Sequence, residues 1–168
     1  MQYRGGTRGR RCLGACLALS SSMLVFVFPS PAAEAYSAGY GYFSIQLTGH
    51  NIPGGGDPSG QGSAQLDFDP EHELACFVVA WRKVDGAVTD LHLYTAPRGH
   101  EGPLWIDFFT GKHFSGVDNT VSGCVHVSES HGMSPKDKIQ AVIHDPAAYY
   151  LNAHSTEFTH GAIRGQLG

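Results

Sequence analysis

Two segments of the chain hold side chains that could bind a metal ion or a ligand. His92 and Tyr94 lie two residues apart in an alternating segment, so in a β-strand both side chains point to the same face. His154 falls in a second predicted strand near the C-terminus. If these strands meet, His92 and His154 are candidate ligands for copper or zinc, because both metals bind imidazole nitrogen. His100 or His160 would have to supply further ligands from loops.

A hydrogen-bonding interpretation of the same histidines stays open. A copper or zinc site requires three or four donors in fixed geometry, and the chain contains no H-x-H and no H-E-x-x-H sequence. His92 and His154 would then bond to each other, to a carboxylate or to a backbone carbonyl. We therefore expect no cofactor, with copper or zinc as the alternative. Dismutase chemistry is not expected, because redox copper needs more histidine ligands.

Arg164 follows in the last predicted strand, where a guanidinium group can pair with a carboxylate through two parallel hydrogen bonds. Glu157 and Asp145 are the candidate partners within the chain. The alternative is that Arg164 recognises an acidic group of a ligand. Tyr94, Asn152 and Arg164 are accordingly the candidate ligand-binding residues.

The sequence assigns no catalytic residue. It has no G-x-S-x-G motif, which would mark the nucleophile of a hydrolase. Ser155 adjoins His154, but neighbouring residues of a strand point to opposite faces and cannot form a nucleophile–base pair. We therefore expect a protein without enzymatic activity.

Almost every segment that would position these residues alternates between apolar and polar residues, as half-buried β-strands do. Segment 74–81 is a nearly continuous apolar run, which indicates a strand buried on both faces. Glycine- and proline-rich turns separate the segments, and the longest, 53–62, is expected to be a mobile loop. The eight predicted strands cover residues 42–49, 63–69, 74–81, 88–96, 104–111, 120–129, 149–155 and 161–167. This series predicts an all-β fold, an antiparallel sandwich or barrel of about eight strands.

One segment, about 134–144, has the pattern of a short α-helix instead. Ser134 is placed to cap its N-terminus, Pro135 suits the first helical position, and Asp137 completes a capping box. The apolar residues of its predicted buried face are Ile139, Val142 and Ile143. We expect this helix to cover one end of the sandwich.

The N-terminus has the layout of a secretory signal peptide at residues 1–35. Four arginines precede an apolar stretch at 12–28, and an A-x-A sequence follows at 33–35. Cleavage there would leave a single domain, residues 36–168. It would remove four of the eleven basic residues and one of the fifteen acidic residues, leaving seven against fourteen, a net charge near −7. A domain this acidic is not expected to bind nucleic acid or an anionic membrane.

Two of the four cysteines, Cys76 and Cys124, would remain after cleavage. An even pair in a small exported domain predicts a disulfide, because the compartment outside the cytoplasm is oxidising. Two buried thiols are the alternative.

Long stretches of the chain resemble the CHRD domain, the module named after chordin. IQLTG…IP…PSGQGSAQLDFDPEHELACFVV is similar to the opening of that domain, and LHLYTAPRGHEGPLWIDF to its next motif. In this second motif His92-Leu93-Tyr94 stands where the family has His-x-His. SPKDKIQAVIHDPAAYYLNAHSTEFTHGAIRGQL follows the end of the family pattern almost continuously. The resemblance covers about residues 42–168.

The resemblance implies a secreted or surface β-sandwich, with a Greek-key arrangement similar to that of copper–zinc superoxide dismutases. It implies no settled activity. We therefore expect an exported, non-enzymatic CHRD-type binding or scaffold domain of the cell envelope or extracellular space, whose partner is an unidentified protein or cell-surface component. The alternative is a copper- or zinc-binding protein that uses His92 and His154.

Overall fold

The computed structural model describes residues 39–168. The predicted signal peptide at 1–35 and its cleavage site lie outside the described residues. Among the helices of the described part, none has the length and apolar character needed to cross a membrane.

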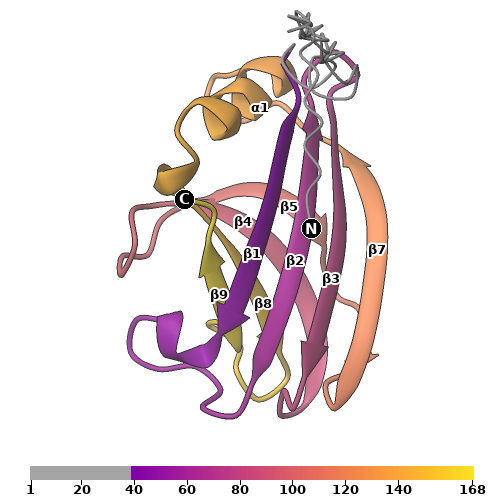
Figure 1. Ribbon diagram of the computed structural model, residues 1–168, viewed down its shortest axis with the longest axis vertical. Coiled ribbons are helices and arrows are strands. Elements are labelled where there is room, and N and C mark those ends of the chain that lie inside the picture. The colour runs from indigo at the N-terminus through magenta and orange to yellow at the C-terminus, as the bar shows by residue number, and fades with distance from the viewer. Residues whose placement is uncertain (1–38) are drawn as a thin grey trace, which may run out of the picture. The chain divides into compact units, whose positions relative to one another are not determined.

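Within residues 39–168, nine antiparallel strands form two layers that face each other (Figure 1). One layer consists of β1 (Gly41–Thr48), β2 (Gln61–Asp69), β3 (Leu74–Arg82) and β7 (Asp118–His126). The other consists of β4 (Ala87–Thr95), β5 (Leu104–Phe109), β8 (Tyr149–Ser155) and β9 (Ile163–Gln166), with the two-residue β6 (Phe114–Ser115) paired to β4. The predicted all-β antiparallel fold is confirmed, and β6 is the strand that the sequence pattern did not reveal.

Hydrogen bonds join the strands in the order β5-β4-β8-β9-β1-β2-β3-β7, a nearly closed sheet. The segments β1-β2-β3 and β8-β9 are consecutive hairpins. In contrast, β7 lies beside β3 and β8 beside β4, so these neighbours are distant in sequence, as a Greek-key arrangement requires. The β4–β8 pairing matters most for function, because it joins the two segments that carry the candidate residues.

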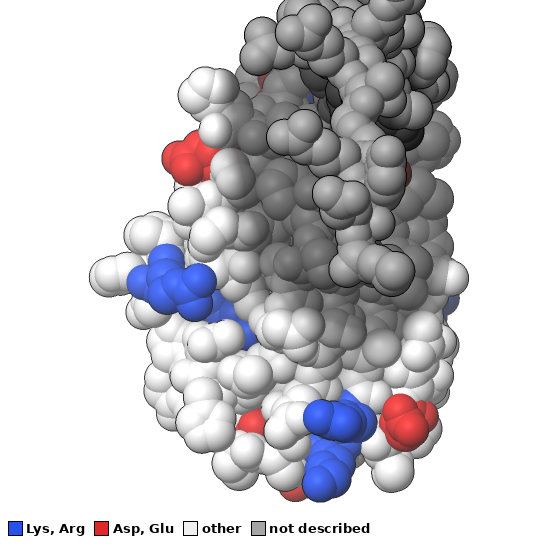
Figure 2. Space-filling view, viewed as in Figure 1, with Lys and Arg blue, Asp and Glu red and all other residues white. Residues whose placement is uncertain are grey.

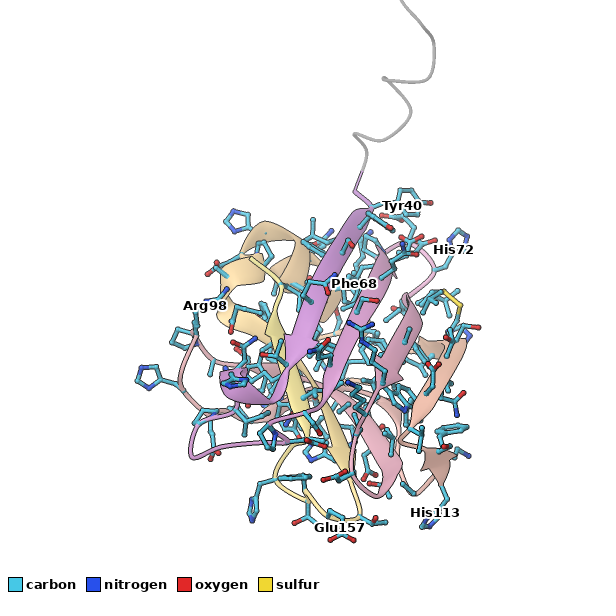
Figure 3. The ribbon with its side chains drawn as sticks, turned by 60° about the horizontal axis from the view of Figure 1, so that its bottom comes forward. Tyr40, Phe68, His72, Arg98, His113 and Glu157 are labelled. Carbon is cyan, nitrogen blue, oxygen red and sulfur yellow. A yellow bond between two sulfur atoms is a disulfide. The ribbon has the colours of Figure 1, made fainter. Side chains whose placement is uncertain are left out.

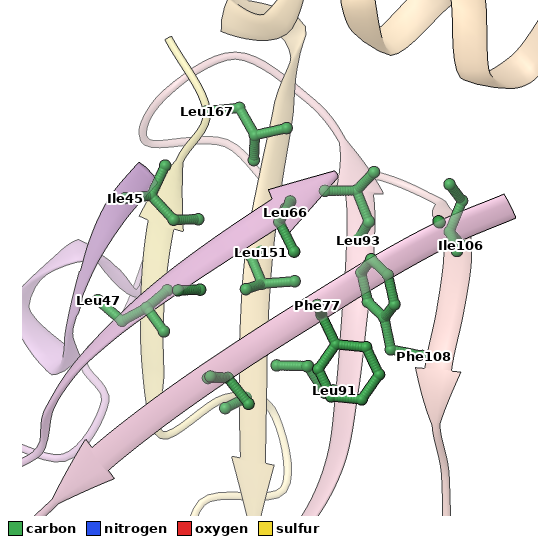
Figure 4. Packing of buried hydrophobic residues seen from close by; sticks show 14 of the residues in the cluster. Ile45, Leu47, Leu66, Phe77, Leu91, Leu93, Ile106, Phe108, Leu151 and Leu167 are labelled. Atoms are coloured by element: carbon green, nitrogen blue, oxygen red, sulfur yellow. The ribbon is translucent and has the colours of Figure 1, made fainter. Parts of the chain in front are cut away.

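The core lies between the layers and follows the alternation of the strands. Figure 4 shows Leu66 and Phe77 of one layer packed against Leu91 and Leu151 of the other. In β3 alternate side chains from Ala75 to Trp81 are buried, whereas Val78 between them is 43% exposed. The prediction that segment 74–81 is buried on both faces is therefore wrong. β3 has neighbours on both edges, but its outer face meets solvent, as is usual in antiparallel sheets.

The predicted helix is confirmed as α1 (Pro135–His144), which lies across one end of the sandwich (Figure 1). The Ser134 side chain accepts a hydrogen bond from the backbone N–H of Asp137, which caps the helix. Ile139 and Val142 are completely buried against the sandwich. Two single turns of 3₁₀ helix, η1 (Gly49–Asn51) and η2 (Pro146–Ala148), adjoin β1 and β8.

The predicted disulfide between Cys76 and Cys124 is present and appears as a yellow bond in Figure 3. The two cysteines are direct partners in the β3–β7 ladder, with Cα atoms 3.9 Å apart. Both side chains lie on the outer face of the layer, so the disulfide links two strands from outside the core.

Charged side chains do not mark a binding surface on the face seen in Figure 2. In that view the basic and acidic residues of the described part lie apart in small groups.

Candidate functional site

The candidate residues of the sequence lie together on the outer face of β4, β8 and β9. The register pairs His92 with Asn152 and Tyr94 with Tyr150 across β4 and β8, and Asn152 with Arg164 across β8 and β9. The residues between them in each strand point into the core, so these side chains point outward. All five predicted site residues are thereby placed on one face: His92, Tyr94, Asn152, His154 and Arg164.

Three of these outward-pointing side chains are buried, which is unusual on the outer face of a sheet. Asn152 is 5% exposed, His154 8% and Arg164 2%. Loops cover them: residues from the segment after β1, from the β4–β5 loop and from the β8–β9 loop line a cavity of about 230 Å³ over the three strands. The cavity wall comprises Ile52, Pro53, Tyr94, Glu101, Gly102, Tyr150, Asn152, His154, Thr159, His160 and Arg164.

His92, Tyr94 and His154 form a hydrogen-bonded chain along one side of this cavity. His154 Nδ1 lies 2.9 Å from the carbonyl oxygen of Thr159, which can only accept, so Nδ1 carries the proton. In the tautomer with its proton on Nδ1, His154 Nε2 accepts from the Tyr94 hydroxyl at 3.1 Å. Because that hydroxyl has one proton to give, His92 Nδ1 donates to the Tyr94 oxygen at 3.1 Å. His92 Nε2 lies 2.8 Å from the hydroxyl of Thr110.

Burial favours the uncharged forms of His92 and Tyr94. Desolvation, together with the nearby His154, lowers the pKa of His92, although Asp107 and Asp90 oppose the shift. Desolvation raises the pKa of Tyr94 to about 12. Three contacts predicted as alternatives for the histidines occur together. His154 bonds to the Thr159 carbonyl, and His92 Nε2 lies 3.4 Å from an Asp107 carboxylate oxygen. Tyr94 bridges the two rings.

The predicted copper or zinc ligands do not form a complete metal site. Within residues 39–168, no three His, Cys, Asp or Glu side chains lie close enough together to hold a metal ion. Nδ1 of His92 and Nε2 of His154 both point at the Tyr94 hydroxyl, which stays protonated and is a poor ligand in that state. His100 contributes its backbone carbonyl to Arg164 instead of its ring.

The predicted carboxylate partners of Arg164 are wrong. No Asp or Glu oxygen within the described residues lies within 4.0 Å of its guanidinium group. Its Nη1 donates to the His100 carbonyl at 2.8 Å, its Nη2 lies 3.5 Å from Gln166 Oε1, and its guanidinium carbon sits 3.3 Å from the centre of the Tyr150 ring. The β8–β9 turn holds Glu157 away from the cavity, and Asp145 ends the helix elsewhere. Arg164 is thus a buried cation held by dipoles and an aromatic face.

Asn152 has hydrogen-bonding capacity left over. Its Nδ2 donates to the His160 carbonyl at 3.2 Å, while its Oδ1 is buried and is the only buried side-chain polar atom within residues 39–168 that lacks a partner. Gly161 allows this close approach, because a Cβ there would lie 2.6 Å from the Asn152 amide. Asn152, whose buried Oδ1 has no partner, therefore lines the cavity and is paired with Arg164 across β8 and β9.

Sequence reasoning missed two residues of the site, Tyr150 and Glu101. The sequence does contain a signal for Tyr150. It lies two residues before Asn152, and the alternation of β8 puts it on the same face as Asn152 and His154. Glu101 gives no such signal, because it lies in an irregular loop whose path over the sheet no pattern predicts.

Comparison with known proteins adds one match. A model of the CHRD domain matches residues 43–167. No curated protein and no solved structure matches the chain. The predicted similarity to the copper–zinc superoxide dismutase sandwich therefore stays a prediction.

Proposed function

The chain belongs to the CHRD domain family, and from this premise we propose that it is an exported, non-enzymatic binding domain of the cell envelope or extracellular space. Its partner would be a protein or another cell-surface component.

The Cys76–Cys124 disulfide supports export. The cytoplasm keeps most thiols reduced, and structural disulfides are typical of proteins outside it. A solvent-facing disulfide has no shielding from cellular reductants, so it fits an oxidising compartment.

The cavity supports a binding role, and it is the observation that carries this part of the proposal. Polar groups on the outer face of β4, β8 and β9 are buried by loops, and one of them, Asn152 Oδ1, has no hydrogen-bond partner. A buried polar atom without a partner costs free energy that a ligand can recover. Ser155 follows His154 in β8 but donates to the Asp85 carbonyl on the opposite face of the strand, so the two do not form a nucleophile–base pair.

Export of the protein and formation of the Cys76–Cys124 disulfide are tested together in the organism that makes the protein. Cells are fractionated and their thiols are blocked with iodoacetamide before any reduction. We expect the protein outside the cytoplasm, with Cys76 and Cys124 unmodified by the reagent because they are bonded to each other. A cytoplasmic protein that carries the label on both cysteines would contradict the proposal.

Copper or zinc binding is the competing function, and metal analysis separates the two. Ring nitrogens of His92 and His154 both lie next to the Tyr94 hydroxyl, which favours metal binding. That hydroxyl is protonated, however, which opposes metal binding. We expect protein purified without chelator to contain well under one copper or zinc per chain. A metal content near one per chain that disappears on replacing both His92 and His154 with alanine would establish the metal-binding function instead.

A further inference from the structure

The cavity over β4, β8 and β9 contains a buried cation, Arg164, with no carboxylate within 4.0 Å among residues 39–168; the charge of Glu101 favours it from farther away. Arg164 is 2% exposed, and its neighbours within hydrogen-bonding reach are a carbonyl and an amide. Stacking on Tyr150 stabilises the charge in part, since a cation over an aromatic face is attracted to the ring. A buried cation is stabilised much more by a carboxylate, which guanidinium groups bind through paired hydrogen bonds.

The unpartnered acceptor belongs to Asn152, the residue paired with Arg164 across β8 and β9. Asn152 and Arg164 are partners in the β8–β9 ladder, so their side chains leave neighbouring strands side by side on the same face. Asn152 Oδ1 has no donor, and it belongs to a side chain that is 95% buried and lines the cavity. A ligand that satisfies both residues carries an anionic acceptor and, next to it, an N–H or O–H donor.

The size and walls of the cavity limit the ligand further. About 230 Å³ is below the roughly 300–1,000 Å³ of pockets for drug-sized ligands, so one small group enters. Ile52 and Pro53 supply an apolar wall, and the Tyr150 hydroxyl lies at the other side, 3.4 Å from the backbone nitrogen of Gly102.

We propose that this cavity binds a small carboxylate whose neighbouring atoms carry a hydrogen-bond donor, with Arg164 holding the carboxylate and Asn152 Oδ1 accepting from the donor. The proposal rests on the binding function proposed above and names its ligand class. Two sources share this chemistry: a free α-hydroxy acid, and the C-terminal residue of a peptide, whose carboxylate follows an amide N–H.

Charges at the rim act in opposite directions. Glu101 is exposed, lines the cavity, and repels an incoming carboxylate. Arg98, labelled in Figure 3, belongs to the same β4–β5 loop, and its charge opposes that of Arg164, whereas the charge of Glu101 favours it. Replacing Glu101 therefore tests the proposal from a surface position, where the fold is not at risk.

The test measures binding of three compounds to the exported, oxidised protein by calorimetric titration. Lactate represents a free α-hydroxy acid, N-acetylalanine represents a peptide C-terminus, and N-acetylalaninamide lacks the carboxylate. We expect one or both carboxylates to bind, at least tenfold more tightly than the amide, and the tighter of the two identifies the source.

Variants locate that binding. Glu101→Gln is expected to tighten it about two- to fivefold, because it removes a nearby like charge. Glu157→Gln, an exposed substitution that changes the net charge equally but does not line the cavity, is the matched control and is expected to leave affinity unchanged. Asn152→Asp is expected to weaken binding at least tenfold, since it places a like charge beside the ligand. Its thermal unfolding is recorded to show that it folds.

Three results would overturn the proposal: no heat of binding from either carboxylate at about 10 mM, equal affinity for the amide, or identical effects of Glu101→Gln and Glu157→Gln. None of them bears on export, which the fractionation experiment tests separately. Conversely, a reduced cytoplasmic protein that binds lactate would overturn the proposed function and leave the ligand assignment standing.

Discussion

Replacing Cys76 and Cys124 together with serine is expected to reduce the free energy of unfolding by about 4 kcal/mol. The two residues are 48 positions apart, and in the chain-entropy account a cross-link over that distance removes many conformations from the unfolded chain. Domains of this size are usually stable by about 5–15 kcal/mol, so the loss takes a large part of the total. β7 depends on this link most, because its other edge has no hydrogen-bonded strand within the described residues.

Urea unfolding of the oxidised protein and of the double variant measures this difference. Val78→Ser is the matched control. Val78 is the next outward residue of β3, its partner in β7 is already Ser122, and it is 43% exposed. The control should therefore lose far less stability than the double variant. Equal unfolding midpoints for the oxidised protein and the double variant would show that the disulfide does not contribute to stability.

The strands and their inward faces were predictable because a period of two is a local property of the sequence. Alternation alone placed His92 and Tyr94 on one face of their strand, and the structure shows that Leu91 and Leu93 of the other face are buried. The same rule failed for segment 74–81, where Val78 extends an apolar run onto a solvent-facing surface. Periodicity reports on each strand by itself and does not say which faces other layers cover.

The candidate site was only partly predictable, because it depends on contacts between distant segments. The hairpin of β8 and β9 follows from a short connection, and it brings Asn152 next to Arg164. The pairing of β4 with β8, which brings Tyr94 to His154, joins residues about sixty positions apart and has no local signal. The burial of Arg164 had no signal either, because three loops must fold over the sheet to produce it.

The glycine-rich loop at 53–62 shows how one polar side chain can organise such a covering loop. It was expected to be mobile, yet Asp57 within it is completely buried. Its Oδ1 accepts from the backbone nitrogens of Ser59 and Gly60 and from the Ser59 hydroxyl, and its Oδ2 accepts from the backbone nitrogen of Asp85 at 2.6 Å. Its own backbone nitrogen donates to the Ala162 carbonyl at the start of β9. Asp57 therefore ties this loop to the β3–β4 turn and to the edge of the site.

Replacing Asp57 with asparagine is expected to reduce the free energy of unfolding by about 3 kcal/mol at neutral pH. The amide keeps one accepting oxygen but turns an N–H₂ group toward the Asp85 backbone nitrogen, which leaves two donors facing each other. Hydrogen bonds to a charged group contribute about 1.5–3 kcal/mol each, and the remaining three also weaken when the charge is lost. Chemical denaturation of both proteins at pH 7 measures the difference.

The pH dependence of the stability difference between the wild type and Asp57→Asn separates the effect of the carboxylate charge from that of the side-chain shape. Burial raises the pKa of Asp57, but hydrogen bonds from Asp85, Ser59 and Gly60 outweigh it, so its pKa lies below the usual value. A carboxylate with a lowered pKa stabilises the fold fully above the unfolded-state pKa, about 4, and this stabilisation is lost as the pH falls through the lower, folded-state value. The difference in the free energy of unfolding between the wild type and Asp57→Asn should therefore be constant above about pH 5 and should become smaller below about pH 4.

The matched control for Asp57 is Asp69, which makes the same kind of turn at the protein surface. Its side chain accepts from the backbone nitrogens of Glu71 and His72, but water can replace those bonds. Asp69→Asn should therefore lose less stability than Asp57→Asn. Two results would show that the charge of the Asp57 carboxylate does not organise the loop. One is an equal loss of unfolding free energy in both variants. The other is a stability difference between the wild type and Asp57→Asn that does not change with pH. The loop would then be held over the cavity by its backbone contacts, among them the bond from Asp57 to Ala162.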